Sequence, residues 1–221
     1  MTIKAVIFDF DGTLMDTETS AYDAYCGIYS EYGHTFALDA WAVGIGTQGN
    51  TFDPYADLER LTGNPVNRKE LKERYLEAHE ANIAKLVLLP GVLARLEEAR
   101  KLGLMIGLAS SSDRAWIERH LTKQGIREYF QVIKTSNDVE RVKPDPALYR
   151  LVVEGLGVQP HEAMAFEDSL HGLSAAKAAG LFGIAVPNLV TAKMDFSAAD
   201  LIMSSMEQRS LEEIIVLLDS K

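Results

Sequence analysis

Apolar residues follow two different rhythms along this chain. Short, continuous runs rich in branched residues are typical of buried strands, and they cover 5–8, 104–109, 132–133, 163–166, 183–186 and 201–202. Apolar residues that recur every three or four positions indicate amphipathic helices, and they cover 91–101, 115–124, 146–154, 170–179 and 211–218. Because strand and helix alternate with short turns, the sequence predicts an α/β fold: a doubly wound, Rossmann-like parallel sheet with helices on both faces.

The stretch from 17 to 85 breaks this alternation. Helical spacing recurs over 17–32, 38–43, 52–61 and 68–86, and no run in this stretch reads as a strand. We therefore expect a helical insertion at 17–85, carried by an α/β core that is built from residues 1–16 and 86–221.

Composition narrows the function classes. The 221 residues are 47% hydrophobic and 24% charged, as in a globular protein with a full core, and the net charge of -10 argues against a nucleic-acid or anionic-membrane partner. Cys26 is the only cysteine, so an intramolecular disulfide is excluded. No run is apolar enough to span a bilayer, and Asp9 and Asp11 interrupt the stretch where a signal peptide would need apolar residues. We expect a cytoplasmic protein, with monomer as the default state.

Polar clusters follow three of the predicted strands. Asp9 and Asp11 come after 5–8, Ser110 and Ser111 after 104–109, and Glu167 with Asp168 after 163–166. In open parallel sheets, ligands bind at the carboxyl ends of the strands, so these clusters should share one site.

The spacing of Asp9 and Asp11 suggests a chemistry. Two positions apart on an extended chain, their side chains point to the same side, where they repel one another unless a cation or shared proton intervenes. Asp9 can serve as a nucleophile toward phosphorus and Asp11 as general acid and then general base, with Mg²⁺ holding the carboxylates and a phosphate. The alternative is an ordinary strand that ends in an Asp-Gly turn.

The other polar positions fit the same chemistry, although each has a structural alternative. Ser110 precedes a helix and can contact a phosphate oxygen, or it can simply cap that helix. Lys143 can neutralise a phosphoryl group, or it can be a solvated loop lysine. Glu167 and Asp168 follow a buried run, where adjacent acids need a cation unless they only cap the next helix.

The motif from Asp9 to Thr13 resembles the first motif, Asp-x-Asp-Gly-Thr, of the haloacid dehalogenase superfamily of phosphotransferases. The later motifs of that superfamily are matched in order by Ser110, by Lys143 and by the pair Glu167-Asp168. The insertion at 17–85 is similar in placement to the helical cap domain of β-phosphoglucomutase-like and phosphoglycolate-phosphatase-like members.

This resemblance implies a Mg²⁺-dependent phosphatase for a small phosphorylated metabolite, such as a sugar phosphate or phosphoglycolate, which acts through an aspartyl phosphate on Asp9. Asp11 would be the acid and base, and the phosphoryl group would be held by Ser110, Ser111 and Lys143. The implied Mg²⁺ ligands are Asp9, the backbone carbonyl of Asp11, Asp168 and, directly or through another group, Glu167.

Substrate specificity is expected to reside on the cap, for which the candidates are Thr17, Glu18, Thr47, Gln48 and Lys72. Mutase-like relatives carry a histidine where this chain has Ala21, and a basic residue in a cap loop where 44–50 has none, so a phosphatase is favoured over a mutase. A catalytically silent binding protein is the alternative from another class. Trp41 and Trp116 are interpreted as core residues, and the five histidines as surface or partly packed.

Overall fold

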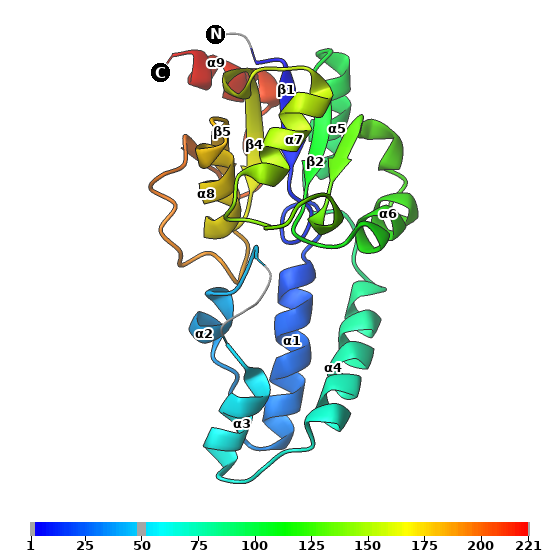
Figure 1. The fold of residues 1–221 in the computed structure, drawn as a ribbon, viewed down its shortest axis with the longest axis vertical. Coiled ribbons are helices and arrows are strands. Elements are labelled where there is room, and N and C mark those ends of the chain that lie inside the picture. Colours follow the sequence, from blue (N-terminus) through cyan, green and yellow to red (C-terminus); the bar gives the residue numbers. More distant parts are fainter. Residues whose placement is uncertain (1–2, 48–51, 221) are drawn as a thin grey trace.

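The computed structural model describes residues 3–47 and 52–220, and within them six parallel strands form one sheet (Figure 1). The strands are β1 (Ala5–Phe8), β2 (Met105–Ala109), β3 (Val132–Lys134), β4 (Ala163–Glu167), β5 (Phe182–Ala185) and β6 (Leu201–Ile202). Their order is β3-β2-β1-β4-β5-β6. The chain thus winds outward from β1 in both directions, and in such sheets the ligand crevice lies beside the carboxyl end of the central strands.

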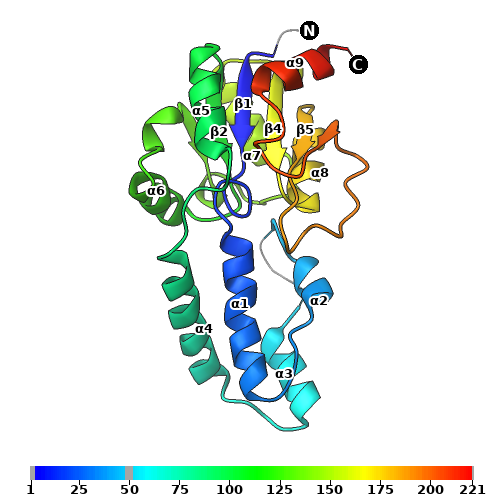
Figure 2. The same cartoon turned by 180° about the vertical axis from the view of Figure 1, so that it is seen from behind.

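Helices cover both faces of the sheet, as the alternation of strand and helix predicts. Val6 and Phe8 face one apolar cluster and Ala5 and Ile7 the other, because successive side chains of a strand point to opposite faces. The first face is covered by α5 (Val92–Lys101), α6 (Arg114–Lys123) and α9 (Leu211–Asp219), and the second by α7 (Ala147–Leu156) and α8 (Leu170–Ala178) (Figures 1 and 2). The predicted fold class is therefore confirmed.

The described residues of the insertion, 17–47 and 52–85, form helices joined by turns and loops, and none of them lies in a strand. It contains α1 (Thr17–Glu31), α2 (Leu38–Ala42), α3 (Pro54–Thr62) and α4 (Arg68–Ile83). These helices enclose an apolar cluster of their own, formed by Tyr25, Ile28, Tyr29, Phe36, Leu58 and Leu71. We refer to residues 17–85 as the cap, which projects from the carboxyl edge of the sheet (Figure 1).

Element ends differ from the prediction by up to three residues. The helix expected over 52–61 begins at Pro54, because the carboxylate of Asp53 accepts hydrogen bonds from the backbone N–H groups of Tyr55 and Ala56. The helix expected over 68–86 ends at Ile83. Three short 3₁₀ helices, at Arg127–Tyr129, Ser136–Asp138 and Pro160–Glu162, have too few residues to show a hydrophobic period.

None of the helices in 3–47 or 52–220 has the length and apolar character that crossing a bilayer requires. Cys26 lies in α1, where burial raises the pKa of its thiol, so a reactive thiolate is disfavoured at neutral pH.

Candidate active site

The sheet brings the three predicted polar clusters to one edge. The backbone N–H of Asp9 continues the β1–β4 ladder by donating to the carbonyl of Phe166 at 3.1 Å, which places Asp9 beside Glu167 and Asp168. On the other side of β1, the N–H of Ser110 donates to the carbonyl of Lys134 at 3.0 Å. The parallel register of the strands thus brings side chains from separate stretches of the sequence together in one group.

Lys143 lies between two of these acids. Its Nζ is 2.5 Å from Asp9 Oδ1 and 2.7 Å from Glu167 Oε1, and its side chain is 1% exposed. The hydroxyl of Tyr149, fully buried on α7, donates to the same oxygen of Glu167. The solvated-loop alternative for Lys143 is therefore excluded, since a buried ammonium ion needs the carboxylates around it.

Three carboxylates form a group that can hold a metal ion. Oxygens of Asp9, Glu167 and Asp168 all lie within 4.8 Å of one another, and the three residues are buried. With all three ionised, Lys143 leaves two negative charges uncompensated. Burial, opposed by Lys143, raises the pKa of Asp9 to about 8, and burial with the charge of Asp9 raises the pKa of Asp168 well above its usual range. A divalent cation that prefers oxygen ligands fits this donor set and this charge.

Asp168 is fixed by contacts from two other loops. Asn188 Nδ2 donates to Asp168 Oδ2 at 2.6 Å and to the carbonyl of Gly12 at 3.4 Å, and Thr13 Oγ1 donates to Asp168 Oδ1 at 3.3 Å. Sequence reasoning misses Asn188. Its position just after the predicted strand 183–186 places it at the same sheet edge, and that is the available signal.

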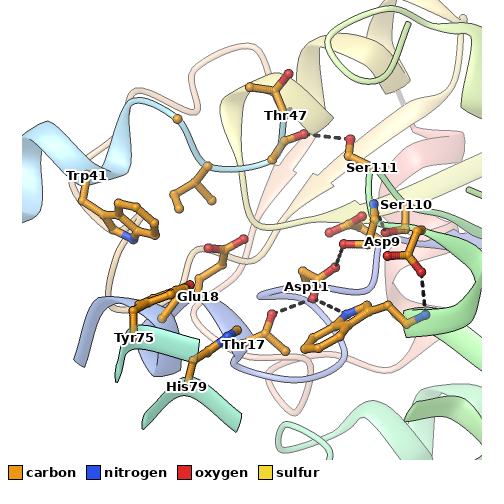
Figure 3. A pocket seen from close by; sticks show the side chains of 17 residues that line it. Asp9, Asp11, Thr17, Glu18, Trp41, Thr47, Tyr75, His79, Ser110 and Ser111 are labelled. Atoms are coloured by element: carbon orange, nitrogen blue, oxygen red, sulfur yellow. Dashed lines mark hydrogen bonds between the residues drawn. The ribbon is translucent and has the colours of Figure 1, made fainter. Parts of the chain in front are cut away.

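The carboxylate of Asp11 is not one of the three that could share a metal ion. It accepts hydrogen bonds from Thr17 Oγ1 at 2.8 Å, Ser112 Oγ at 2.6 Å and Trp116 Nε1 at 3.0 Å. Those donors hold it at the wall of the pocket beside Asp9 (Figure 3). A carboxyl group in this position can exchange a proton with a bound molecule.

A pocket of about 500 Å³ lies between this edge and the cap (Figure 3). From the core it is lined by Asp9, Asp11, Ser110, Ser111, Ser112, Asp113 and Trp116. From the cap it is lined by Thr17, Glu18, Ala21, Trp41, Gly44, Ile45, Gly46, Thr47, Tyr75 and His79. Among the cap candidates, Thr17, Glu18 and Thr47 thus face the pocket, and Gln48 lies outside the described residues.

Lys72, the remaining cap candidate, is not among the residues that line this pocket, and its role in specificity stays a prediction. It is exposed near the start of α4, whereas Tyr75 and His79 of the same helix line the pocket. A helix rises about 1.5 Å per residue, so Lys72 lies about 10 Å along the axis from His79, toward the end of α4 that points away from the core (Figure 1).

Both tryptophans pack partly against apolar clusters, in line with their interpretation as core residues, but both also line the pocket. Trp41 packs partly against the cap cluster and also lines the pocket, and Trp116 lines it from α6. The ring of Trp116 stacks on His79 with centroids 6.2 Å apart, and His79 stacks on Tyr75 at 5.4 Å. Trp116 lies in the first turn of the helix that follows Ser110. Its closeness to Ser110 in the sequence indicates a position near the site, which helical spacing alone does not show.

Glu18 carries its carboxylate into the pocket (Figure 3). Burial, followed by the charges of Asp11, Asp9 and Asp16, raises its pKa to about 8. Together with Asp9 and Asp11 it makes the pocket acidic.

The two serines play different parts. Ser110 is buried, and its Oγ accepts from the backbone N–H of Ser112 at 3.0 Å, so its hydroxyl hydrogen can be donated to a bound oxygen. Ser111 Oγ donates instead to the carbonyl of Gly46 in the cap at 3.0 Å. His171 Nδ1 lies 3.0 Å from the carbonyl of Ile45, a second link between core and cap.

Comparison with known proteins shows the family of the chain. The sequence model of the family described as haloacid dehalogenase-like hydrolase matches residues 6–186. "Putative phosphatase YhcW" of Bacillus subtilis (strain 168) is 44% identical over 223 residues, which is 99% of either chain. "Hexitol phosphatase B" of Escherichia coli (strain K12) is 32% identical and covers 96% of this chain and 97% of its own length.

Solved structures give the same grouping. CbbY from Rhodobacter sphaeroides in complex with phosphate superimposes with a TM-score of 0.74 at 29% identity, over 99% of this chain and 100% of that one. A variant of CbbY in complex with xylulose-(1,5)bisphosphate gives the same TM-score and identity over 96% of this chain and 98% of that one. On the family match and the full-length similarity to phosphatases, the chain belongs to the haloacid dehalogenase-like hydrolases and is a phosphoric monoester hydrolase of that family.

Proposed function

We propose that this protein is a Mg²⁺-dependent phosphatase that hydrolyses a phosphorylated sugar or polyol through an aspartyl phosphate on Asp9. The observation that carries the proposal is the buried group of Asp9, Glu167, Asp168 and Lys143 beneath a pocket lined by Asp11 and Ser110. In this proposal, these groups at one sheet edge supply a nucleophile, a proton donor, phosphate-binding groups and a cation site.

The first half-reaction transfers the phosphoryl group to the protein. A carboxylate oxygen of Asp9 forms a bond to phosphorus as the bond from phosphorus to the ester oxygen breaks, and Asp11 gives its proton to the departing oxygen. Lys143 and the hydroxyl of Ser110 hold the equatorial oxygens of the transferring group.

The second half-reaction restores the protein. Asp11, now ionised, takes a proton from water as that water attacks phosphorus, and the bond from phosphorus to Asp9 breaks to release inorganic phosphate. The three hydrogen bonds to Asp11 keep its carboxylate at the pocket wall in both steps.

Asp9 and Asp168, the backbone carbonyl of Asp11 and, directly or through another group, Glu167 would hold the cation. Bound there, Mg²⁺ would neutralise the carboxylates and the phosphoryl oxygens and so stabilise the charge that develops during transfer. Without it, no cation in the pocket would offset the charges of an anionic substrate and of the carboxyl groups of Asp9, Asp11 and Glu18 as these ionise.

The substrate class is inferred from the pocket and the relatives together. A cavity of about 500 Å³ accommodates a sugar-sized molecule, and its wall combines aromatic rings with carboxylate and hydroxyl groups. The names of two relatives, a hexitol phosphatase and a CbbY variant solved with xylulose-(1,5)bisphosphate, point to phosphorylated carbohydrates.

A mutase is less well supported. It would need to hold a second phosphate in the cap while the first is transferred, and the described residues that line the pocket include no lysine or arginine. Ala21, at the position where mutase-like relatives carry a histidine, lines the pocket with a methyl group only.

We also infer that residues 17–85 act as a cap domain that closes over a core of residues 1–16 and 86–221. The separate apolar cluster of the cap supports this division. A monomeric, cytoplasmic enzyme without nucleic-acid or membrane partners remains the prediction.

The test is release of inorganic phosphate from a panel of sugar, hexitol and glycolate phosphates, in Mg²⁺ and in chelator. We expect release in Mg²⁺ only, and its loss in Asp9→Asn. Asp23→Asn, an identical change at an exposed position of α1, should retain activity. An acid quench during turnover should leave phosphate on Asp9, detectable by mass spectrometry.

Three outcomes would contradict the proposal. Phosphate release from none of the esters would indicate a binding protein. Phosphate release by Asp9→Asn at the wild-type rate would contradict an aspartyl phosphate on Asp9. Conversion of β-glucose 1-phosphate to glucose 6-phosphate without phosphate release would indicate a mutase.

A further inference from the structure

The carboxylate of Asp11 is held from three separate segments of the chain. Thr17 is the first residue of α1, Ser112 lies in the loop after β2, and Trp116 belongs to α6. The two hydroxyl groups can rotate and can either donate or accept, whereas the indole N–H only donates. Trp116 is therefore the partner that fixes which oxygen of Asp11 faces α6.

The indole ring of Trp116 has a second contact, with the cap. It stacks on His79 of α4 at an interplanar angle of 19°, and His79 stacks on Tyr75 of the same helix at 16°. His79 and Trp116 both line the pocket, so the stack forms part of its wall where α4 approaches α6. Stacking between aromatic rings is attractive, so the contact with His79 adds to the one that Trp116 makes within α6, where the ring of His120 lies 4.3 Å away between centroids.

We propose that Trp116 is a positioning residue for Asp11, and that its stacking on His79 makes the orientation of Asp11 depend on the cap being in place. The inference rests on the proposed function, because it requires Asp11 to be the proton donor. In this arrangement a cap that has moved away withdraws His79 from the indole ring, and the N–H of Trp116 is then less firmly aligned with Asp11 Oδ1.

The consequence differs between substrates. When the bond from phosphorus to the ester oxygen breaks, a departing alkoxide needs the proton of Asp11, whereas p-nitrophenolate is stable without it. Loss of alignment should therefore slow alkyl esters far more than p-nitrophenyl phosphate. A variant that is merely less well folded would slow both esters by the same factor.

The experiment compares kcat/KM for benzyl phosphate and p-nitrophenyl phosphate, two esters of similar shape, in wild type and in Trp116→Phe. Since general acid catalysis contributes about 10²- to 10⁴-fold, partial misplacement should lower kcat/KM for benzyl phosphate by about tenfold or more. For p-nitrophenyl phosphate we expect a fall of less than about threefold, because little proton transfer is needed.

Trp41→Phe is the matched control. Trp41 lines the same pocket, but its Nε1 has no hydrogen-bond partner among the described residues, so the same substitution there removes an N–H that holds nothing. The ratio of kcat/KM between the two esters should stay at its wild-type value in this variant.

His79→Ala tests the link to the cap without touching the hydrogen bond to Asp11. We expect it to shift the ratio of kcat/KM between the two esters in the same direction as Trp116→Phe. In the double variant this ratio should equal that of Trp116→Phe alone, since the two residues act through one contact. This arm also gives an answer should Trp116→Phe fail to fold.

Equal slowing of both esters by Trp116→Phe would overturn the positioning role while leaving the phosphatase intact. An unchanged ratio in His79→Ala would overturn the dependence on the cap. Release of phosphate from neither ester by the wild-type protein in Mg²⁺ would instead contradict the proposed function, and this inference with it.

Discussion

Gly12 lies so close to Asp168 that no side chain fits between them. A Cβ atom at position 12 would come within 2.1 Å of Asp168 Oδ2, and the backbone of Gly12 has a φ of +79°. The turn that follows Asp9 is thus packed directly against the end of β4. The acids of two distant stretches of sequence, Asp9 and Asp168, have oxygens within 4.8 Å of one another and could share a cation.

We therefore expect Gly12→Ala to abolish phosphate release and to destabilise the protein. The left-handed conformation alone costs an alanine about 1–2 kcal/mol, and the collision with Asp168 adds to it. Gly33→Ala is the control, since Gly33 has a φ of +74° and a Cβ atom there would meet nothing within 4 Å. Urea unfolding and phosphate release should separate the two variants, and equal losses in both would show that Asp168 is not crowded.

Replacing Lys143 tests the charge balance of the buried group. Lys143→Met leaves Asp9 and Glu167 without their buried counter-ion, and removing one partner of such a pair destabilises by about 3–5 kcal/mol. We expect a large fall in urea stability in metal-free buffer, together with loss of phosphate release.

The matched control is Lys177→Met. Lys177 also lies 2.5 Å from a carboxylate, that of Asp200, but the two side chains are 34% and 18% exposed. A solvated pair of this kind contributes about 0–1 kcal/mol. Comparable destabilisation by both substitutions would contradict the assignment of Lys143 to a buried charge network.

Binding of a metal ion should raise the thermal stability of the folded protein. A ligand that binds only the folded protein stabilises it by about 2.7 kcal/mol at one hundred times its Kd, so Mg²⁺ should raise the melting temperature and chelator should lower it. Asp168→Asn should remove this response, because it takes away one of the three buried carboxylates. Asp39→Asn, at an exposed position of the cap, should keep it. A response to Mg²⁺ that survives in Asp168→Asn would place the cation elsewhere.

The core of this site can be predicted because it follows from sheet geometry. Runs that end in Asp9, Ser110 and Glu167 have the pattern of parallel strands, and parallel strands necessarily bring their carboxyl ends to one edge. The pattern of apolar residues in the sequence is therefore enough to predict which polar residues share this edge. The prediction of a helical insertion rests on the same kind of pattern, since the spacing in 17–85 is helical throughout.

The pocket wall cannot be predicted in the same way. Helical spacing shows that a residue faces inward, but it does not say whether the inner side is a packed core or a cavity. The spacing therefore predicts core positions for Trp41 and Trp116, which line the pocket, and charge alone favours Lys72, which is exposed. Tyr149 likewise gives no sign in the sequence that its hydroxyl meets Glu167.

Glu18 should make the stability of the metal-free protein depend on pH. Its pKa is 4.5 in the unfolded chain and about 8 in the folded protein, raised by burial and by the charges of Asp11, Asp9 and Asp16. Between these values the folded state holds a proton that the unfolded state has lost, so stability falls as pH rises, by at most about 1.4 kcal/mol per unit. Glu18→Gln lacks this proton. We would measure the free energy of unfolding in urea at about pH 5.5 to 7.5, a window between those two pKa values. As pH rises, the free energy of unfolding of Glu18→Gln should increase relative to that of wild type. For Glu77→Gln, a change at an exposed position of α4, the difference from wild type should stay constant across this window. Parallel curves for all three proteins would show that Glu18 is ionised in the folded pocket.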